Sequence, residues 1–264
     1  MPFFSKKVPS RLRSYRLVLI ALMMALAGPS LPAYANQPIR NVVLVHGAFA
    51  DGSSWSDVIA LLQRDGYHAT AVQNPLTSLA DDVTATQRVL ARQHGDVILV
   101  GHSWAGAVVT EAGNAANVKG IVYLSALVPD SGESVNTLLD RLRSPMTGMK
   151  PDEYGLIWLD DPAAFKHVMA GDVRDDRVKL LASVAPPIAT ATFDGKITHA
   201  AWRDKPTWYL VTNGDHALPT PVQRKMADQI GAHRITLASS HMSLISHPKD
   251  VVRLIEQAAA TAGH

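Results

Sequence analysis

Apolar residues recur along this chain with two different spacings, which predict two kinds of element. Apolar runs are typical of buried strands, and they occur at residues 41–45, 97–100, 120–127 and 207–211. Residues 68–73 and 234–237 are predicted to form two further strands. Apolar residues three and four positions apart predict amphipathic helices, and this spacing occurs at residues 55–65, 79–94, 221–230 and 249–260. Strands and helices therefore alternate, which predicts an α/β fold with a mostly parallel sheet and helices on both faces.

The alternation is interrupted between residues 128 and 201. This part of the chain contains Pro, Met and aromatic residues and helical fragments such as 161–169. We predict a helical cap inserted after a central strand. Several of its large apolar side chains are expected to line a substrate pocket, while most pack the cap onto the body. These side chains are Met146, Met149, Tyr154, Trp158, Phe165, Met169, Phe193 and Trp202.

The first residues, 1–35, have the pattern of a secretory signal peptide. Basic residues without any acidic residue precede an apolar run at 17–27, and Ala33 and Ala35 are small residues at the two positions that signal peptidase reads. The run is shorter than the roughly 20 residues that a membrane-spanning helix needs, although a retained N-terminal anchor is the alternative. We predict export to the periplasm or the medium, no stable membrane anchor after cleavage behind Ala35, and a folded domain at 36–264.

Charge and composition exclude several classes of protein. The formal net charge of the whole chain is +2, but the basic excess lies in the predicted signal peptide, so the remaining chain is acidic. No basic stripe predicts nucleic-acid binding. Cysteine is absent, which excludes a thiol nucleophile and a thiolate metal site. The histidines show no metal-ligand spacing, so we expect neither a metal nor an organic cofactor.

A serine follows the apolar run at 97–100. Ser103 lies within Gly101-His102-Ser103-Trp104-Ala105-Gly106, and an apolar helical pattern begins directly after it. A strand, a sharp turn and a helix in this order force the serine into a strained backbone conformation that needs small neighbours, and they expose its hydroxyl. Gly101 and Ala105 are such neighbours. The pattern predicts a nucleophilic serine.

A serine nucleophile needs a base and an orienting acid, and both follow later in the chain. Asp215 comes just after the predicted strand at 207–211, and His241 comes just after the one at 234–237. Parallel sheets gather their chemistry at the carboxyl ends of their strands, so we expect these two side chains near Ser103. Asp130 also follows a strand and stays an alternative to Asp215 as the acid.

Four motifs carry a resemblance to the α/β-hydrolase superfamily, and within it to plant methylesterases and hydroxynitrile lyases and their bacterial esterase relatives. The motifs are His46 to Trp55, Gly101 to Gly106, Ser125 to Glu133, and Ser240 to Met242. The resemblance implies Ser103 as nucleophile, Asp215 as acid and His241 as base. It also implies an oxyanion hole formed by the backbone N–H groups of Ala48 and Trp104. The chain departs from the usual pattern at Ala105, where glycine is common.

The resemblance implies hydrolysis of small to medium apolar carboxylic esters through an acyl-enzyme. The related lyases have a threonine after the first histidine of the oxyanion loop and a lysine after the catalytic histidine. Gly47 and Met242 occupy these positions here, which favours an esterase. A non-catalytic ligand-binding protein and a perhydrolase that uses the same three residues stay open as alternatives. The expected partner is a small ester, and the sequence predicts no particular oligomeric state.

Overall fold

A computed structural model of the chain describes residues 1–2, 39–145 and 149–263. The chain divides into two units, Met1–Gln37 and Pro38–His264. Apart from Met1 and Pro2, the predicted signal peptide lies outside the described residues, and so does Met146 of the predicted cap. The description that follows concerns the second unit.

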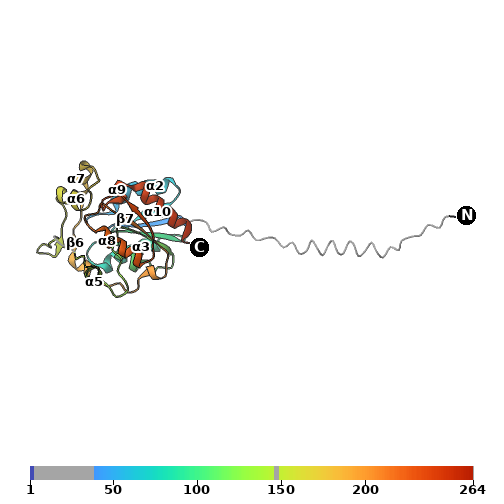
Figure 1. Cartoon of the computed structure of the whole chain (residues 1–264), viewed down its shortest axis with the longest axis horizontal. Helices are drawn as coiled ribbons and strands as arrows, with labels where there is room; N and C mark the ends of the chain where they lie inside the picture. The colour runs from blue at the N-terminus through green and yellow to red at the C-terminus, as the bar shows by residue number, and fades with distance from the viewer. Residues whose placement is uncertain (3–38, 146–148, 264) are drawn as a thin grey trace. The chain divides into compact units, whose positions relative to one another are not determined.

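A sheet lies at the centre of this unit, between the helices (Figure 1). It has six parallel strands in the order β2-β1-β3-β4-β7-β8. The strands are β1 (Asn41–Val45), β2 (His68–Ala71), β3 (Val97–His102), β4 (Val118–Leu124), β7 (Thr207–Thr212) and β8 (His233–Leu237). All residues of β3 and β7 are buried, as their continuous apolar character predicts. The predicted parallel sheet is confirmed.

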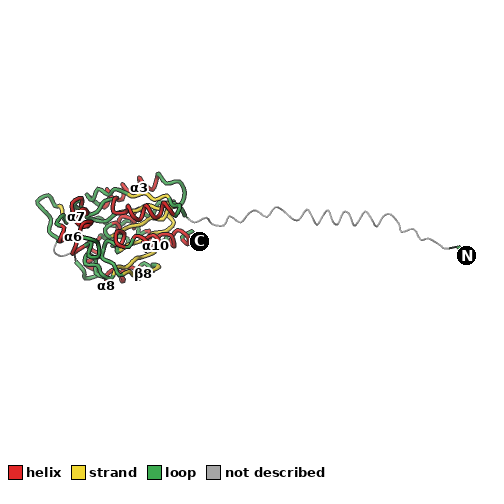
Figure 2. The backbone as a smooth tube through the Cα atoms, turned by 90° about the horizontal axis from the view of Figure 1, so that it is seen from above, coloured by secondary structure: helices red, strands yellow, loops and turns green. Residues whose placement is uncertain are grey.

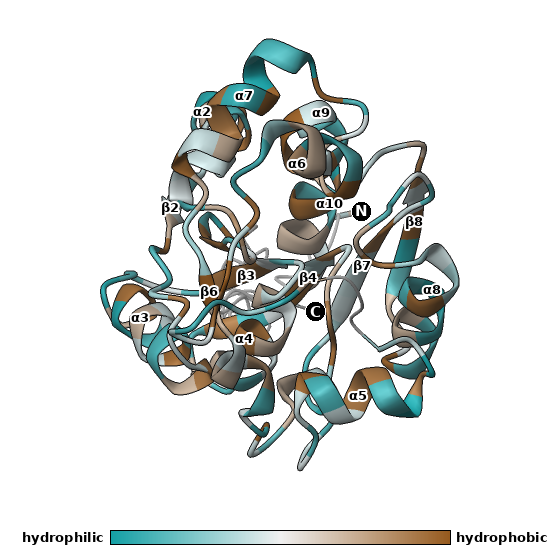
Figure 3. Ribbon diagram, turned by 90° about the vertical axis from the view of Figure 1, so that its left-hand side faces the viewer, coloured by the Kyte–Doolittle hydropathy of each residue, from teal (hydrophilic) through white to brown (hydrophobic). Residues whose placement is uncertain are grey.

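Helices cover both faces of the sheet. Figure 3 shows α2 (Ser56–Arg64) and α10 (Pro248–Thr261) on one face, and α3 (Leu79–Ala91) and α4 (Ala105–Ala112) on the other. The helix α8 (Thr220–Gln229) packs on β7. Two short helices, η1 (Gly52–Trp55) and α9 (Ser243–Ser246), follow β1 and β8. No helix in the described part of the chain is long and apolar enough to cross a bilayer.

An insertion joins β4 to β7. Figure 2 shows its helices α6 and α7 at the end of this unit that lies away from the C-terminal helix α10. Its elements are α5 (Val135–Arg141), β5 (Leu156–Ile157), α6 (Pro162–Val168), α7 (Asp175–Val184), β6 (Ile188–Ala189), η2 (Thr190–Asp194) and η3 (Ala201–Arg203). The insertion was expected to start at residue 128, but β4 ends at Leu124. The apolar run continues past the strand because Ala126, Leu127 and Val128 are buried in the connection that follows.

Candidate active site

Ser103 occupies a strained turn between β3 and α4. Its φ is +55°, a left-handed conformation that costs free energy in a residue with a side chain. The turn is tight. A Cβ at Gly101 would lie 2.8 Å from the carbonyl oxygen of Ala105, and one at Gly106 would collide with the carbonyl oxygen of Leu127. The sequence places glycines where this turn admits no side chain, and Ala105 is accommodated.

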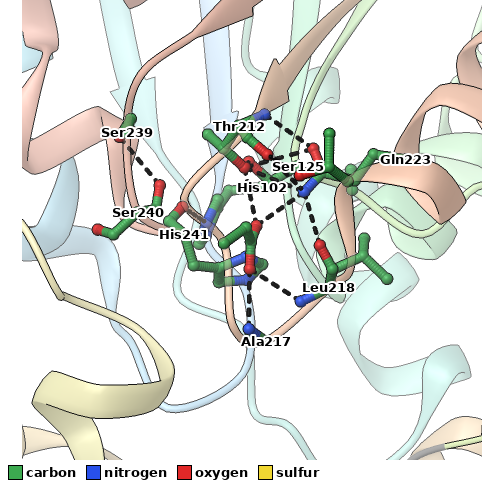
Figure 4. Close-up of polar contacts among 12 residues, drawn as sticks. His102, Ser125, Thr212, Ala217, Leu218, Gln223, Ser239, Ser240 and His241 are labelled. Carbon is green, nitrogen blue, oxygen red and sulfur yellow. Dashed lines mark hydrogen bonds and ion pairs between the residues drawn. The ribbon is translucent and has the colours of Figure 1, made fainter.

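Asp215 lies between β7 and α8 and is 8% exposed. Its carboxylate accepts five hydrogen bonds. Figure 4 labels the five donor residues. The donors are the N–H groups of Ala217 and Leu218 on Oδ1, both at 2.8 Å, and Thr212 Oγ1 at 2.8 Å, Gln223 Nε2 at 2.9 Å and His241 Nδ1 at 2.7 Å on Oδ2. Burial, the largest influence, raises the pKa of Asp215. The charge of His241 and the hydrogen bonds outweigh it, so the pKa is below its ordinary value.

His241 follows β8 and is 1% exposed. Because its Nδ1–H donates to Asp215, its Nε2 is the nitrogen left to act as a base. This buried Nε2 has no hydrogen-bond partner among the described residues. The backbone of the loop is anchored on two sides. His102 Nε2–H donates to the carbonyl oxygen of His241 at 3.0 Å, and the N–H of Met242 donates to that of Met169 at 3.1 Å.

Two further buried histidines, His46 and His102, make hydrogen bonds to backbone groups of neighbouring loops, although Nδ1 of His102 has no partner among the described residues. Burial, reinforced by the charge of His241, lowers the pKa of His102 to about 3, so its ring stays neutral. The N–H of Asn74 donates to His46 Nε2 at 2.9 Å, and His46 Nδ1–H therefore donates to the carbonyl oxygen of Gly47 at 2.9 Å. Burial also lowers the pKa of His46. Both rings thus hold loops in place.

A cavity of about 590 Å³ lies beside the loops that follow β3 and β8, and both Ser103 and His241 line it. Its wall is largely apolar. Of the cap side chains expected to line a pocket, four do so: Met149, Trp158, Met169 and Phe193.

The remaining described cap aromatics do not contact the cavity. Phe165 is fully buried in the core, Tyr154 is 78% exposed, and Trp202 Nε1–H donates to the carbonyl oxygen of Pro129 at 3.1 Å. A single sequence does not separate these packing roles from pocket roles, because all of these side chains are large and apolar.

Ala48 and Trp104, expected to donate their backbone N–H groups to an oxyanion, both line the cavity beside Ser103. Trp104 directly precedes α4, and the first N–H groups of a helix have no intrahelical acceptor. The loop that carries Ala48 approaches the serine closely, since a Cβ at Gly47 would lie 2.8 Å from Ser103 Cβ. Both backbone segments therefore lie next to Ser103.

Asp130, the alternative acid, lies elsewhere. Its carboxylate accepts from Arg203 Nε at 2.8 Å and from Nη2 at 2.5 Å. The hydrogen bond from Arg203 is the largest influence on the pKa of Asp130 and lowers it. The carboxylate that accepts a hydrogen bond from His241 is that of Asp215. In the described part of the chain, no group of three or more His, Asp or Glu side chains could hold a metal ion.

Sequence reasoning missed two buried polar residues near the site. Gln223 of α8 donates to Asp215, and Asp82 of α3 accepts a hydrogen bond from the indole of Trp104. Both are 0% exposed. A signal was present in the sequence: Asp82 has helical spacing with the apolar residues Leu79 and Leu90, which is a core position. A carboxylate there needs a partner.

The fold, the serine turn and the buried Asp–His pair together define a class, and comparison with known proteins gives the same class. The Alpha/beta hydrolase family matches residues 42–254, and the chain belongs to this family.

Three relatives illustrate the range. The "Alpha/beta hydrolase nvfD" of Aspergillus novofumigatus is 28% identical over 243 residues, which is 84% of this chain and 97% of the relative. The "Carbendazim hydrolyzing esterase" of a Nocardioides species is 34% identical over 121 residues, 40% of this chain and 50% of the relative. A solved methylesterase from Arabidopsis has a TM-score of 0.69 at 21% identity, over 83% of this chain and 98% of that one. The resemblance to this group is confirmed, and the chain is related to esterases.

Proposed function

We propose that the protein is a serine esterase that hydrolyses carboxylic esters with small to medium apolar groups. One observation carries the proposal: His241 is bound through Nδ1 to the buried carboxylate of Asp215 and leaves Nε2 unpartnered, while His241 and the strained Ser103 line the same cavity. An esterase activity also agrees with the names of the relatives from Nocardioides and Arabidopsis.

Acylation follows from this geometry. Ser103 Oγ attacks the ester carbonyl carbon while its proton passes to His241 Nε2. Asp215 stays ionised, holds the ring tautomer and stabilises the imidazolium. The carbonyl oxygen becomes an oxyanion between the N–H groups of Ala48 and Trp104, each worth roughly 3 kcal/mol in comparable sites. Collapse of the intermediate breaks the bond to the alkoxy oxygen, which takes the proton from His241 and leaves as the alcohol.

Deacylation reverses these roles. A water molecule loses a proton to His241 Nε2 and attacks the acyl carbon, and the second tetrahedral intermediate collapses. Ser103 Oγ leaves and takes the proton back, and the carboxylic acid is released. No group beyond the chain's own residues and water takes part in either step.

Two positions favour an ester hydrolase over a cyanohydrin lyase. A Cβ at residue 47 would lie 2.8 Å from Ser103 Cβ and 2.9 Å from the carbonyl oxygen of His102, so the threonine of the lyases does not fit this backbone. Met242, which stands where the lyases have a lysine, is 0% exposed and apolar. Methionine has no charge that would stabilise a departing cyanide ion.

Hydrolysis of p-nitrophenyl esters with acyl chains of increasing length tests the proposal. We expect the highest kcat/KM with short to medium chains, and loss of nearly all activity in Ser103→Ala. Ser144→Ala, which removes another hydroxyl from the cavity wall, serves as the matched control and is expected to stay within about threefold of the unmodified protein. An unchanged rate in Ser103→Ala would overturn the proposal, and binding of the esters without turnover would favour a ligand-binding protein.

We further propose that residues 1–35 direct export. The support is the order of basic residues, apolar run and Ala33-Tyr34-Ala35 in the sequence. Mass spectrometry of the protein recovered from the periplasm or medium is expected to give an N-terminus at Asn36. A full-length chain in the membrane fraction would show that the segment is a retained anchor.

A further inference from the structure

Asp82 is a buried carboxylate that the proposed reaction does not use. It belongs to the first turn of α3 and is 0% exposed. Its Oδ2 accepts from Trp104 Nε1–H at 2.7 Å, and its Oδ1 accepts from the N–H of Leu76 at 2.8 Å. Among the described residues no cation forms an ion pair with it. A buried charge without a counter-charge costs free energy, and the two hydrogen bonds that Asp82 accepts offset this cost only in part.

The first partner of Asp82 is part of the cavity. Trp104 follows Ser103 directly, its side chain is almost fully buried, and its indole packs edge-on against the ring of Phe193 at 5.3 Å between centroids. Trp104 and Phe193 both line the cavity. The side chain that Asp82 holds therefore belongs to the residue whose backbone N–H is proposed to bind the oxyanion.

The second partner of Asp82 connects it to the insertion. Leu76 has a φ of +59°, and while its N–H is bound by Asp82, its carbonyl oxygen accepts from the N–H of Ala189 at 3.0 Å. The hydroxyl of Thr192 donates to the same carbonyl oxygen at 3.4 Å. The contacts run without a break from β6 and η2 through Leu76 and Asp82 to the residue beside the nucleophile.

We infer that Asp82 is a positioning residue that fixes Trp104, both as oxyanion donor and as cavity wall, and thereby ties the insertion to the serine turn. The inference rests on the proposed function, because it assigns the Trp104 N–H a role in that reaction. A carboxylate suits this place because both neighbours are donors. An amide has one acceptor oxygen, so Asn at this position would turn its NH₂ group toward either the indole N–H or the Leu76 N–H.

The energetic cost of this arrangement is consistent with a functional role. Burial, the largest influence, raises the pKa of Asp82 to about 6, and the hydrogen bonds from Trp104 and Leu76 oppose that rise only in part. An apolar residue would fill a core position of α3 without this penalty. Perturbed carboxylates of this kind are frequent next to functional sites.

A double-mutant cycle tests the inference. We expect Asp82→Asn to lower kcat about tenfold with KM changed less than about twofold, because a hydrogen bond to a charged group is lost and a donor is placed against a donor. In the Trp104→Phe background the same change is expected to leave kcat within about twofold, since the indole donor is gone. Equal effects of Asp82→Asn in both backgrounds would overturn the inference. Asp81→Asn, the matched change at the neighbouring exposed carboxylate, is expected to leave activity unchanged.

Trp104→Phe alone keeps the test decisive if Asp82→Asn does not fold. It keeps an aromatic ring beside Phe193 and removes the indole N–H together with part of the ring volume, so kcat is expected to fall at least about tenfold at nearly constant KM. Unchanged kcat in this variant would overturn the inference.

A readout that does not depend on catalysis separates this inference from the proposed function. The chain has 5 Trp, and the ¹H–¹⁵N indole resonance that disappears in Trp104→Phe identifies Trp104. Loss of its hydrogen bond in Asp82→Asn is expected to move this resonance upfield, also in the inactive Ser103→Ala protein. An unmoved resonance would show that Asp82 does not hold the indole. Full activity in Ser103→Ala with a moved resonance would instead refute the proposed esterase mechanism and leave the contact intact.

Discussion

Two carboxylates are buried in two regions of this protein, and their pKa values are shifted in opposite directions. Asp215, in the loop after β7, accepts five hydrogen bonds and faces a histidine, and its pKa is lowered. Asp82, in the first turn of α3, accepts two hydrogen bonds without an ion-pair partner among the described residues, and burial raises its pKa to about 6. Both are nearly inaccessible to solvent.

The comparison shows that burial alone does not decide the charge of a carboxyl group. In both regions desolvation is the largest influence and raises the pKa. The number of hydrogen-bond donors and the presence of His241 decide whether this rise in pKa is overcome. A group that must stay charged to orient an imidazolium needs a full set of donors. A group that holds an indole functions with fewer.

The largest effect is expected from Asp215→Asn. The substitution leaves an NH₂ group against the side-chain donors on Oδ2 and no longer fixes the tautomer of His241. We expect kcat/KM for a p-nitrophenyl ester to fall about 10⁴-fold, as the same change does in serine proteases. Asp130→Asn, the same change at the carboxylate paired with Arg203, is the control and is expected to stay within about threefold. A larger loss of kcat/KM in Asp130→Asn than in Asp215→Asn would identify Asp130 as the acid.

The two regions also predict opposite pH dependences of stability. Because the pKa of Asp215 is lowered on folding, its stabilisation is present above about pH 4 and is lost as pH falls through the folded-state pKa. The stability gap between the unmodified protein and Asp215→Asn is therefore expected to narrow in acid. Because the pKa of Asp82 is raised to about 6, its destabilisation grows as pH rises from about 4 to about 6.

Urea unfolding at pH 3 and pH 7 measures both effects. Relative to Asp82→Asn, the unmodified protein is expected to lose about 3 kcal/mol of unfolding free energy between the lower and the higher pH. Relative to Asp215→Asn, it is expected to gain. If the unfolding free energy changed in the same direction with pH in both comparisons, the opposite pKa shifts of Asp82 and Asp215 would be contradicted.

Gln223→Leu makes the surroundings of Asp215 more like those of Asp82, because it removes one hydrogen-bond donor from the carboxylate of Asp215. Its Nε2–H donates to Asp215 at 2.9 Å and its Oε1 accepts from the N–H of Thr212 at 2.9 Å, so the variant leaves Asp215 with fewer donors. We expect a loss of about tenfold in kcat and of about 1–3 kcal/mol in stability. Gln229→Leu makes the same change on the last residue of α8, and an equal loss of kcat there would show that the effect is only structural.

The smallest effect is expected at a third carboxylate that is only partly buried. Asp172 accepts from the N–H of Ser240 at 3.1 Å and from its hydroxyl, next to His241, while its side chain is 30% exposed. Water replaces lost contacts at such a site, so Asp172→Asn should lower kcat less than about threefold. Asp176→Asn, at an exposed carboxylate of α7, is the control. A loss of kcat above about 30-fold would show that the insertion, through Asp172, contributes more to positioning His241 than we expect.

Much of the fold was predictable because the central strands β1, β3, β4 and β7 are largely continuous apolar runs, and every predicted strand has a counterpart in the sheet. The residues proposed for catalysis could be found as well, since Ser103, Asp215 and His241 each follow a strand. The contact between Asp82 and Trp104 could not be predicted, because it joins positions 22 apart, one in α3 and the other in the turn before α4, with no repeated pattern. The helices α5 and α7 of the insertion were missed, since short helices without a regular apolar spacing depend on packing that local sequence does not report.

The most direct test of the central claim, that Ser103 is a nucleophile activated by the His241–Asp215 pair, is labelling with a fluorophosphonate probe followed by peptide mass spectrometry. We predict a single adduct on the peptide that contains Ser103, no adduct in Ser103→Ala, and strongly slowed labelling in His241→Ala. An adduct on another residue, or ester hydrolysis that persists while Ser103 stays unlabelled, would contradict the account.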